Sequence, residues 1–281
     1  MHYFTFASKD TFISSGSNRI TGVSEKDRNF GQDQILEVKK EFFNDSFDFQ
    51  TRALVQFDLT TISESVADGT ITNPSYFLRL FEAEGNQEQT LDYTLHAQVI
   101  SQSWDEGVGK SGDNPKTING CSFTNRINKP GISALTWSNA NGTPSNGPTT
   151  LVVSSSTQTF SNQSPDVEMN ITNMTKGWIT GSTGGGFDNY GLLLRFSASQ
   201  ETDSTTFGQL KFFSKQTHTI FSPKLEVRWD DHIAATGSAT GTLSPLNVAG
   251  TEDNYLYVKR LKEKYKETDR VKFRVGARKR Y

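Results

Sequence analysis

Short runs in which apolar and polar residues alternate occupy most of the first 230 positions. Eight of these runs are rich in β-branched or aromatic residues, as expected for half-buried strands. They cover 35–39, 54–59, 76–81, 93–99, 149–153, 191–196, 209–213 and 224–229. Clusters of Gly, Ser, Asn, Asp and Pro separate the runs and have the composition of turns. This pattern predicts an all-β fold, an antiparallel β-sandwich or jelly roll over residues 1–230.

One segment, 166–179, has a helical period. It places Val167, Ile171, Met174 and Trp178 at spacings of four, three and four residues. Its first part could equally be a strand, so we expect a strand that leads into a short helix.

Apolar side chains in the predicted strands are candidates for the core of the sandwich. The residues expected in the core or beside it are Leu54, Val55, Phe57, Leu78, Leu80, Val99, Leu193 and Val227. Because side chains alternate across a strand, only one of Leu54 and Val55 is expected to face inward.

The pattern changes after residue 230. Small and polar residues without periodicity fill 231–250, which indicates a linker or an extended arm. Two further strand-like runs, 255–261 and 270–275, predict that 251–281 forms a basic β-hairpin or the start of a second β domain. A two-stranded hairpin is marginally stable alone in water, so we expect another chain or a further stretch of polypeptide to complete this unit.

The composition is that of a folded chain without a membrane span. Of 281 residues, 33% are hydrophobic and 21% are charged, which excludes general disorder. No apolar run reaches the 18 residues needed to cross a bilayer. The first residues lack the basic and apolar segments of a signal peptide, and Cys121 is a single cysteine, so we expect synthesis in a cytoplasm.

Charge is unevenly distributed, although the net charge is only −2. Residues 259–281 contain eleven Lys and Arg against three Asp and Glu. One interpretation is a solvated β-ribbon. The other is that 251–281 docks on an acidic surface, such as that of a second copy, through its unpaired strand edges. DNA is disfavoured as a partner because the run lacks a helix or interleaved aromatic residues suited to a groove.

The second interpretation defines a predicted assembly interface. It combines the apolar first strand with the basic end of the chain. Its residues are Phe4, Phe6, Tyr255, Tyr257, Val258, Val271, Phe273, Arg274, Arg278 and Arg280.

No group of residues has the spacing of a catalytic or metal site. The four histidines are scattered, and no Gly-x-Ser-x-Gly motif occurs. The run Gly107–Ser111 fails as a phosphate loop because Trp104 stands where the first glycine is required. Neighbouring carboxylates such as Asp105 and Glu106 are expected to be turn residues, with one loosely held calcium ion as the alternative. We therefore expect no enzyme activity, no cofactor and no bound nucleotide.

Aromatic side chains are the remaining candidates for binding. An exposed tryptophan can stack on the apolar face of a sugar ring. Trp137 is the best candidate because it lies among polar residues, and Asn139 and Asn141 beside it would supply hydrogen bonds. The other tryptophans are expected to pack in the sandwich or at its ends.

A series of short motifs suggests a family. In order they are Asp-Thr-Phe-Ile at 10–13, Asn-Phe-Gly at 29–31, 35–38, 52–59, Trp-Asp-Glu-Gly at 104–107, 166–167, Trp178 with Gly181, 189–195 and 223–229. Together they resemble the DNRLRE-type β-sandwich domain, a module often attached to bacterial polysaccharide lyases and surface proteins. The stretch 129–149 and the basic end lie outside this resemblance.

The C-terminal segment carries a second resemblance. Residues 255–261 and 274–281 look like segments of structural proteins from tailed bacteriophages of marine bacteria. This resemblance implies a non-enzymatic virion protein of the tail, neck or fibre, made in the host cytoplasm and assembled with copies of itself and neighbouring virion proteins. The alternative is a carbohydrate-binding module that acts as an adhesin or host-surface receptor-binding protein, with a surface polysaccharide as partner.

Overall fold

The computed structural model describes two compact units, residues 1–231 and 232–281. The described residues are 1–18, 22–43, 46–83, 92–139, 141–145, 147–153, 155–160 and 166–229, with 236–237, 242–243, 254–259, 264 and 274–279 beyond them. Within these ranges, no helix is both long enough and apolar enough to span a membrane.

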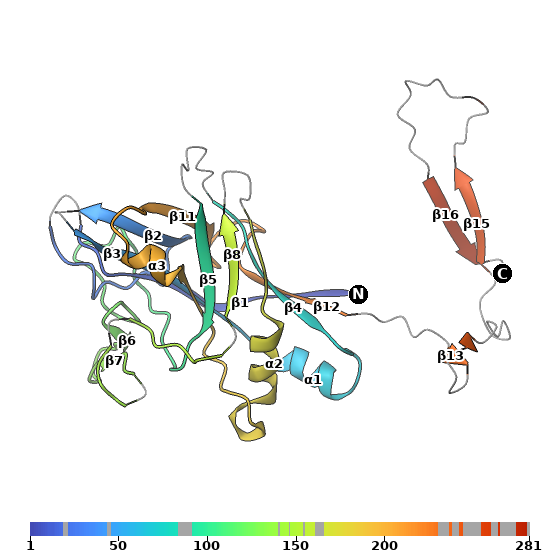
Figure 1. Cartoon of the computed structure of the whole chain (residues 1–281), viewed down its shortest axis with the longest axis horizontal. Helices are drawn as coiled ribbons and strands as arrows, with labels where there is room; N and C mark the ends of the chain where they lie inside the picture. Colours follow the sequence, from blue (N-terminus) through green and yellow to red (C-terminus); the bar gives the residue numbers. More distant parts are fainter. Residues whose placement is uncertain are drawn as a thin grey trace. The chain divides into compact units, whose positions relative to one another are not determined.

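The first unit is built mainly from strands (Figure 1). They are β1 (His2–Ser14), β2 (Ile35–Phe43), β3 (Ser46–Phe57), β4 (Ser75–Leu80), β5 (Tyr93–Val99), β6 (Asn125–Ile127), β7 (Leu135–Thr136), β8 (Ser156–Phe160), β9 (Val167–Asn170), β10 (Leu192–Phe196), β11 (Gly208–Phe213) and β12 (Lys224–Arg228). The described helices are short: α1 (Thr60–Ala67), α2 (Thr172–Thr180), the 3₁₀ turn η1 (Ser182–Gly184) and α3 (Ala198–Thr202). All described strand pairs are antiparallel, which confirms the predicted fold class.

Apart from β6 and β7, which form a separate two-stranded sheet, these strands form one sheet that folds into two layers and nearly closes. Its order is β8-β5-β10-β3-β1-β12-β4-β9, and β2 joins both β3 and β11. Strand β1 belongs to both layers: residues 2–6 pair with β12, and residues 7–14 pair with β3 after an irregularity between Ala7 and Lys9. The two ends of the order meet because the Gln158 amide of β8 donates to the Asp166 carbonyl and accepts from the Glu168 amide of β9, both at 2.8 Å.

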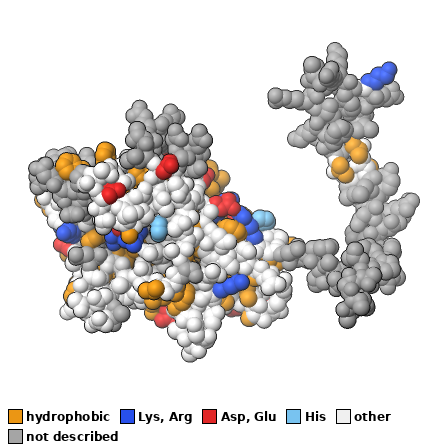
Figure 2. All heavy atoms as spheres, in the orientation of Figure 1, with side chains coloured by type: hydrophobic (Ala, Val, Ile, Leu, Met, Phe, Trp, Pro, Cys, Tyr) orange, Lys and Arg blue, Asp and Glu red, His pale blue; other side chains and the backbone are white. Residues whose placement is uncertain are grey.

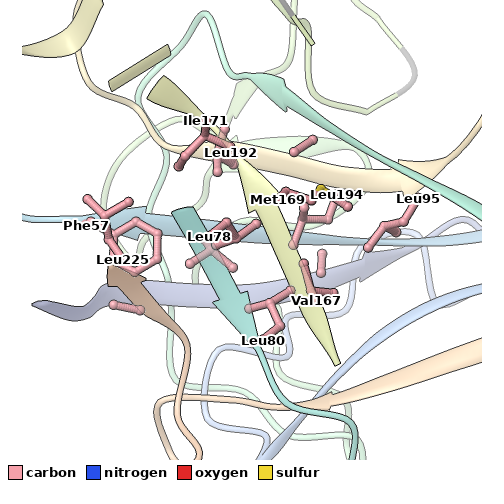
Figure 3. Close-up of a cluster of buried hydrophobic side chains, with 14 of the residues drawn as sticks. Phe57, Leu78, Leu80, Leu95, Val167, Met169, Ile171, Leu192, Leu194 and Leu225 are labelled. Atoms are coloured by element: carbon pink, nitrogen blue, oxygen red, sulfur yellow. The ribbon is translucent and has the colours of Figure 1, made fainter. Parts of the chain in front are cut away.

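The main core lies between the two layers. Figure 3 shows Leu78 and Leu80 of β4 with Val167 of β9, close to Leu192 and Leu194 of β10. All eight residues predicted in or beside the core are buried.

Leu54 and Val55 are both buried because β3 is covered on both faces. Val55 packs in the main core, whereas Leu54 and Leu193 pack in a second cluster with Trp104 and Trp137. Both tryptophans come from 101–150, a long excursion that folds over the second face of the sheet. The alternation rule therefore predicted one buried face for β3, whereas the structure buries both faces.

Several elements differ from the sequence prediction. The strand predicted at 149–153 is wrong: these residues are irregular, Val152 is fully exposed, and β8 follows at Ser156–Phe160. Helices α1 and α3 were not predicted. The expected strand followed by a short helix is confirmed as β9 and α2.

The second unit contains two small hairpins. Strand β13 (Thr236–Gly237) pairs with β14 (Thr242–Leu243) inside the segment expected to be a linker. Strand β15 (Asn254–Lys259) pairs with β16 (Arg274–Lys279), which overlaps the predicted run 270–275 at its last two residues; 270–273 lie outside the described residues.

Candidate functional site

A groove of about 910 Å³ opens in the first unit where β1, β2 and β3 meet the loops before β2 and after β5. Thr51 of β3 pairs in register with Lys39 of β2, so both side chains lie on one sheet face. The lining residues are Phe12, Ser14, Gly16, Ser17, Asn18, Glu25, Arg28, Phe30, Gln32, Asp33, Gln34, Ile35, Glu37, Lys39, Glu41, Thr51, Ala83, Lys110, Ser111 and Lys211.

Alternation along β2 brings charged side chains into the groove. Leu36 and Val38 are buried, whereas Glu37, Lys39 and Glu41 line the groove. The Lys39 ammonium lies 3.0 Å from the Glu37 carboxylate and 3.7 Å from that of Glu41. This arrangement holds the Lys39 ammonium between two carboxylates, so the row carries one net negative charge.

The loop after Trp104 forms one wall of the groove and is fixed by Arg28 and Asp33. The Arg28 guanidinium donates to the carbonyls of Ser111 at 3.1 Å and Asp113 at 3.0 Å, and it also pairs with Glu25. The Asp33 carboxylate accepts from the amide and the hydroxyl of Ser111, at 3.0 and 3.1 Å. Burial raises the pKa of Asp33, although these hydrogen bonds from Ser111 lower it.

The glycines of Gly107–Ser111 allow the loop to pack closely against Asn29. A Cβ on Gly109 would lie 2.3 Å from the Asn29 carbonyl oxygen, and one on Gly31 would lie 2.2 Å from that of Glu106. The Asn29 amide donates to the Glu106 carbonyl at 2.7 Å, and its side-chain oxygen accepts from the Gly109 amide at 2.8 Å. The segments 29–31 and 104–107 therefore contact each other directly behind the wall of the groove.

Three groove side chains retain unused hydrogen-bonding capacity. Within the described part of the chain, the side-chain amides of Gln32 and Gln34 and the ammonium of Lys110 make no hydrogen bond or ion pair. Phe12 and Phe30 stack beneath them with ring centroids 4.2 Å apart, and each is only 6% exposed. The groove therefore offers polar donors and acceptors above an aromatic base.

The predicted sugar-binding residues lie elsewhere. The prediction that Trp137 is exposed is wrong: it is 0% exposed, and its indole N–H donates to the Ser122 carbonyl at 2.9 Å. Trp137 is buried because it covers the apolar second face of the sheet. Asn139 is exposed, but its side-chain oxygen accepts from the amides of Asn141 and Thr143, at 3.2 and 3.1 Å, and so shapes a turn.

The predicted assembly residues fall into three groups. Phe4 and Phe6 are exposed on β1, and Val258 is exposed on β15 beside half-buried Tyr257. Tyr255, Arg274 and Arg278 lie in the paired strands β15 and β16. Val271, Phe273 and Arg280 lie outside the described residues. The assembly interface itself stays a prediction.

Sequence reasoning missed the groove. A signal was present, because Leu36 and Val38 alternate with Glu37 and Lys39, although Lys40 breaks the pattern before Glu41. A strand face that carries charged side chains is normally interpreted as exposed to solvent. Only the surrounding loops show that this face lines a groove. The loop residues that surround it come from 16–18, 25–34 and 110–111, and their convergence depends on long-range contacts.

Comparison with known families bears on this groove. Residues 2–108 match carbohydrate-binding module family 96. Seventeen of the twenty groove-lining residues fall within this segment. No curated protein and no solved structure matches the chain.

The family 96 segment accounts for only part of the first unit. It contains β1 to β5, and those strands pair with β8 to β12 from outside the segment. A carbohydrate-binding module is a non-catalytic domain, so the match indicates a binding role for residues 2–108. It assigns no role to residues 109–281.

Proposed function

We propose that the first unit binds carbohydrate and that the groove is its contact site. The observation that carries this proposal is the position of the groove: nearly all of its lining comes from the segment that matches a carbohydrate-binding family. A ligand site is usually concave and fixes orientation through a few placed polar groups. The groove meets both conditions.

The chemistry of the lining suits a polyol. Each sugar hydroxyl is a donor and an acceptor, and a side-chain amide offers both functions. Gln32 and Gln34 can therefore bond to hydroxyls without breaking an existing contact. Lys39 is already held between Glu37 and Glu41, so these side chains are ordered before a ligand binds. Less conformational entropy is then lost on binding, which favours affinity.

Affinity gel electrophoresis of the full chain tests the proposal, with a panel of soluble neutral and acidic polysaccharides in the gel. We expect the wild-type chain to be retarded by at least one of them. The double variant Gln32→Ala, Gln34→Ala should weaken binding about thirtyfold, since two lost hydrogen bonds at about 1 kcal/mol each remove about 2 kcal/mol.

Asn141→Ala is the matched control. Asn141 is an exposed amide in the turn after Trp137, and we expect its truncation to leave retardation unchanged. Loss of binding in Asn141→Ala with full binding in the groove variant would move the site to 129–149. Absence of retardation by every polysaccharide would refute carbohydrate binding.

The virion role and the virion location stay predictions that rest on sequence resemblance alone. The DNRLRE resemblance itself also stays a prediction. The family match supports the carbohydrate-binding alternative. Use of that binding on a host surface is part of the same proposal.

A further inference from the structure

The outer face of the layer β1-β12-β4-β9 carries side chains in cross-strand rows. One row runs Phe4, Glu226, Phe77 and Asn170 across the four strands. The next row runs Phe6, Lys224, Arg79 and Glu168. The pairing register is unbroken across these strands, so the rows lie on one continuous face opposite the core.

An ion-pair network holds the centre of this face. Arg228 donates to both Glu226 oxygens at 2.8 Å and to Glu168 at 2.6 Å. Arg79 lies 3.1 Å from Glu226 and also pairs with Glu168, while the His2 ring nitrogen lies 2.7 Å from Glu226. Figure 2 shows basic, acidic and histidine side chains gathered on the first unit near the place where Figure 1 draws β4 and β12. The network compensates its own charge and fixes the planar guanidinium groups.

Exposed aromatic rings flank the network. Phe4 is 46% exposed, Phe6 54% and Phe221 42%. The Lys224 ammonium lies 5.4 Å from the ring centroid of Phe6 and 5.1 Å from that of Phe81. Among the described residues, that ammonium has no carboxylate partner. Folding thus leaves several aromatic rings of this face in contact with water, although a core was available to bury them.

We propose that this face is a second carbohydrate-contact surface, and that its ligand is the flat surface of packed, uncharged polysaccharide chains. The inference rests on the proposed function and extends it to ligands that the groove cannot admit. Exposed rings stack on the apolar faces of pyranose units. The edges of Arg79, Glu168 and Asn170 present donors and acceptors to the hydroxyls between them.

Two observations favour an uncharged glycan over other partners. The central charges are already paired, so a charged ligand would compete with existing contacts. The family 96 segment also contributes β1 and β4, and with them Phe4, Phe6 and Arg79. A single chain fits a concave groove, whereas an open sheet face is complementary to the surface of an insoluble particle.

A sedimentation assay on insoluble polysaccharides tests the inference, with microcrystalline cellulose, curdlan and insoluble mannan as probes and the full chain as the protein. The double variant Phe4→Ser, Phe6→Ser should lower affinity for the bound probe about tenfold, as expected for two lost stacking contacts. Its retardation by soluble polysaccharide should stay unchanged. The groove variant Gln32→Ala, Gln34→Ala should rank the other way: it should lose retardation by soluble polysaccharide and lose less affinity for insoluble probes than the Phe4, Phe6 variant does.

Phe207→Ser is the matched control, because Phe207 is 58% exposed and lies between α3 and β11, away from this face. Thermal unfolding shows whether each variant remains folded.

Three outcomes would overturn the inference. The Phe4, Phe6 variant could bind insoluble probes as the wild type does, or the wild type could bind soluble polysaccharide and none of the insoluble probes. Light scattering could also show a wild-type dimer that this variant converts to monomer, which would make the face an interface between copies. If the wild type binds neither soluble nor insoluble polysaccharide, the proposed function fails as well.

Discussion

Asp10 should make the folded state less stable as pH rises toward neutrality. Its side chain lies in β1 and is almost fully buried. One carboxylate oxygen accepts from the Lys215 amide at 2.5 Å, and the other has no partner among the described residues. Burial raises the pKa of Asp10 from 3.8 to about 7, and the nearby charge of Glu106 adds to this, against the opposing contacts with Lys215.

The sign of the effect follows from the two states of the chain. In the unfolded chain Asp10 ionises near pH 3.8, whereas the folded chain keeps the proton until about pH 7. The free energy of unfolding therefore falls as pH rises between these values. The free energy of unfolding falls by about 1.4 kcal/mol for each pH unit between the two pKa values. The fall ends near pH 7, so the change from pH 5 to pH 8 includes about two such units and amounts to about 3 kcal/mol.

Urea unfolding of the wild type and Asp10→Asn at pH 5 and pH 8 measures this loss. Asparagine cannot ionise, so the variant should lack the Asp10 contribution to pH dependence. Lowered pKa values, such as that of Glu226 at about 2, affect stability below this range. The lowered pKa of His96 acts within the range but is shared by both chains, so it cancels in the comparison.

Asp68→Asn provides the control, because Asp68 is exposed and its pKa is lowered by hydrogen bonds from Thr70. It should show the wild-type pH dependence. Identical pH dependence in Asp10→Asn and the wild type would refute the reasoning, since a carboxyl that ionises equally in both states cannot be buried as described.

Two further predictions concern packing. Lys40→Met should lower the free energy of unfolding by about 3 kcal/mol in urea titrations. Lys40 is buried, and its ammonium bonds to Asp203 and to the Gln200 carbonyl at 2.7 Å, so the substitution leaves these partners without their cation. An unchanged unfolding midpoint would contradict this. Gly31→Ala should cost about 1–3 kcal/mol because its Cβ would meet the Glu106 carbonyl, and movement of the groove wall should also weaken retardation by soluble polysaccharide. Full retardation with lowered stability would separate that wall from binding.

Local pattern predicted the strands well because alternation is a local property. The runs at 35–39, 76–81 and 224–229 each overlap an observed strand. The run at 149–153 has the same composition but forms no strand, because it connects the excursion over the second sheet face to β8. The run makes one antiparallel bridge, between Thr150 and Ile100, and does not extend it into a strand. Residue type alone does not reveal which apolar runs extend such a pairing.

The candidate sites depended on contacts that a sequence does not display. Trp137 has polar neighbours and was predicted to be exposed, yet it covers Leu54 and Leu193 across the sheet. Phe4 and Phe6 were singled out for assembly, and the structure does place both in contact with water. The groove forms only where three separate segments of the chain come together, so no single sequence motif predicts it.

Strand β1 couples the two proposed contact surfaces mechanically. Its first half carries Phe6 on the outer face, and its second half carries Phe12 at the base of the groove. At about 3.3 Å per residue, these positions lie no more than about 20 Å apart along one hydrogen-bonded strand. A polysaccharide particle held at the outer face would therefore raise the effective concentration of its loose chain ends at the groove, which is the condition for avidity.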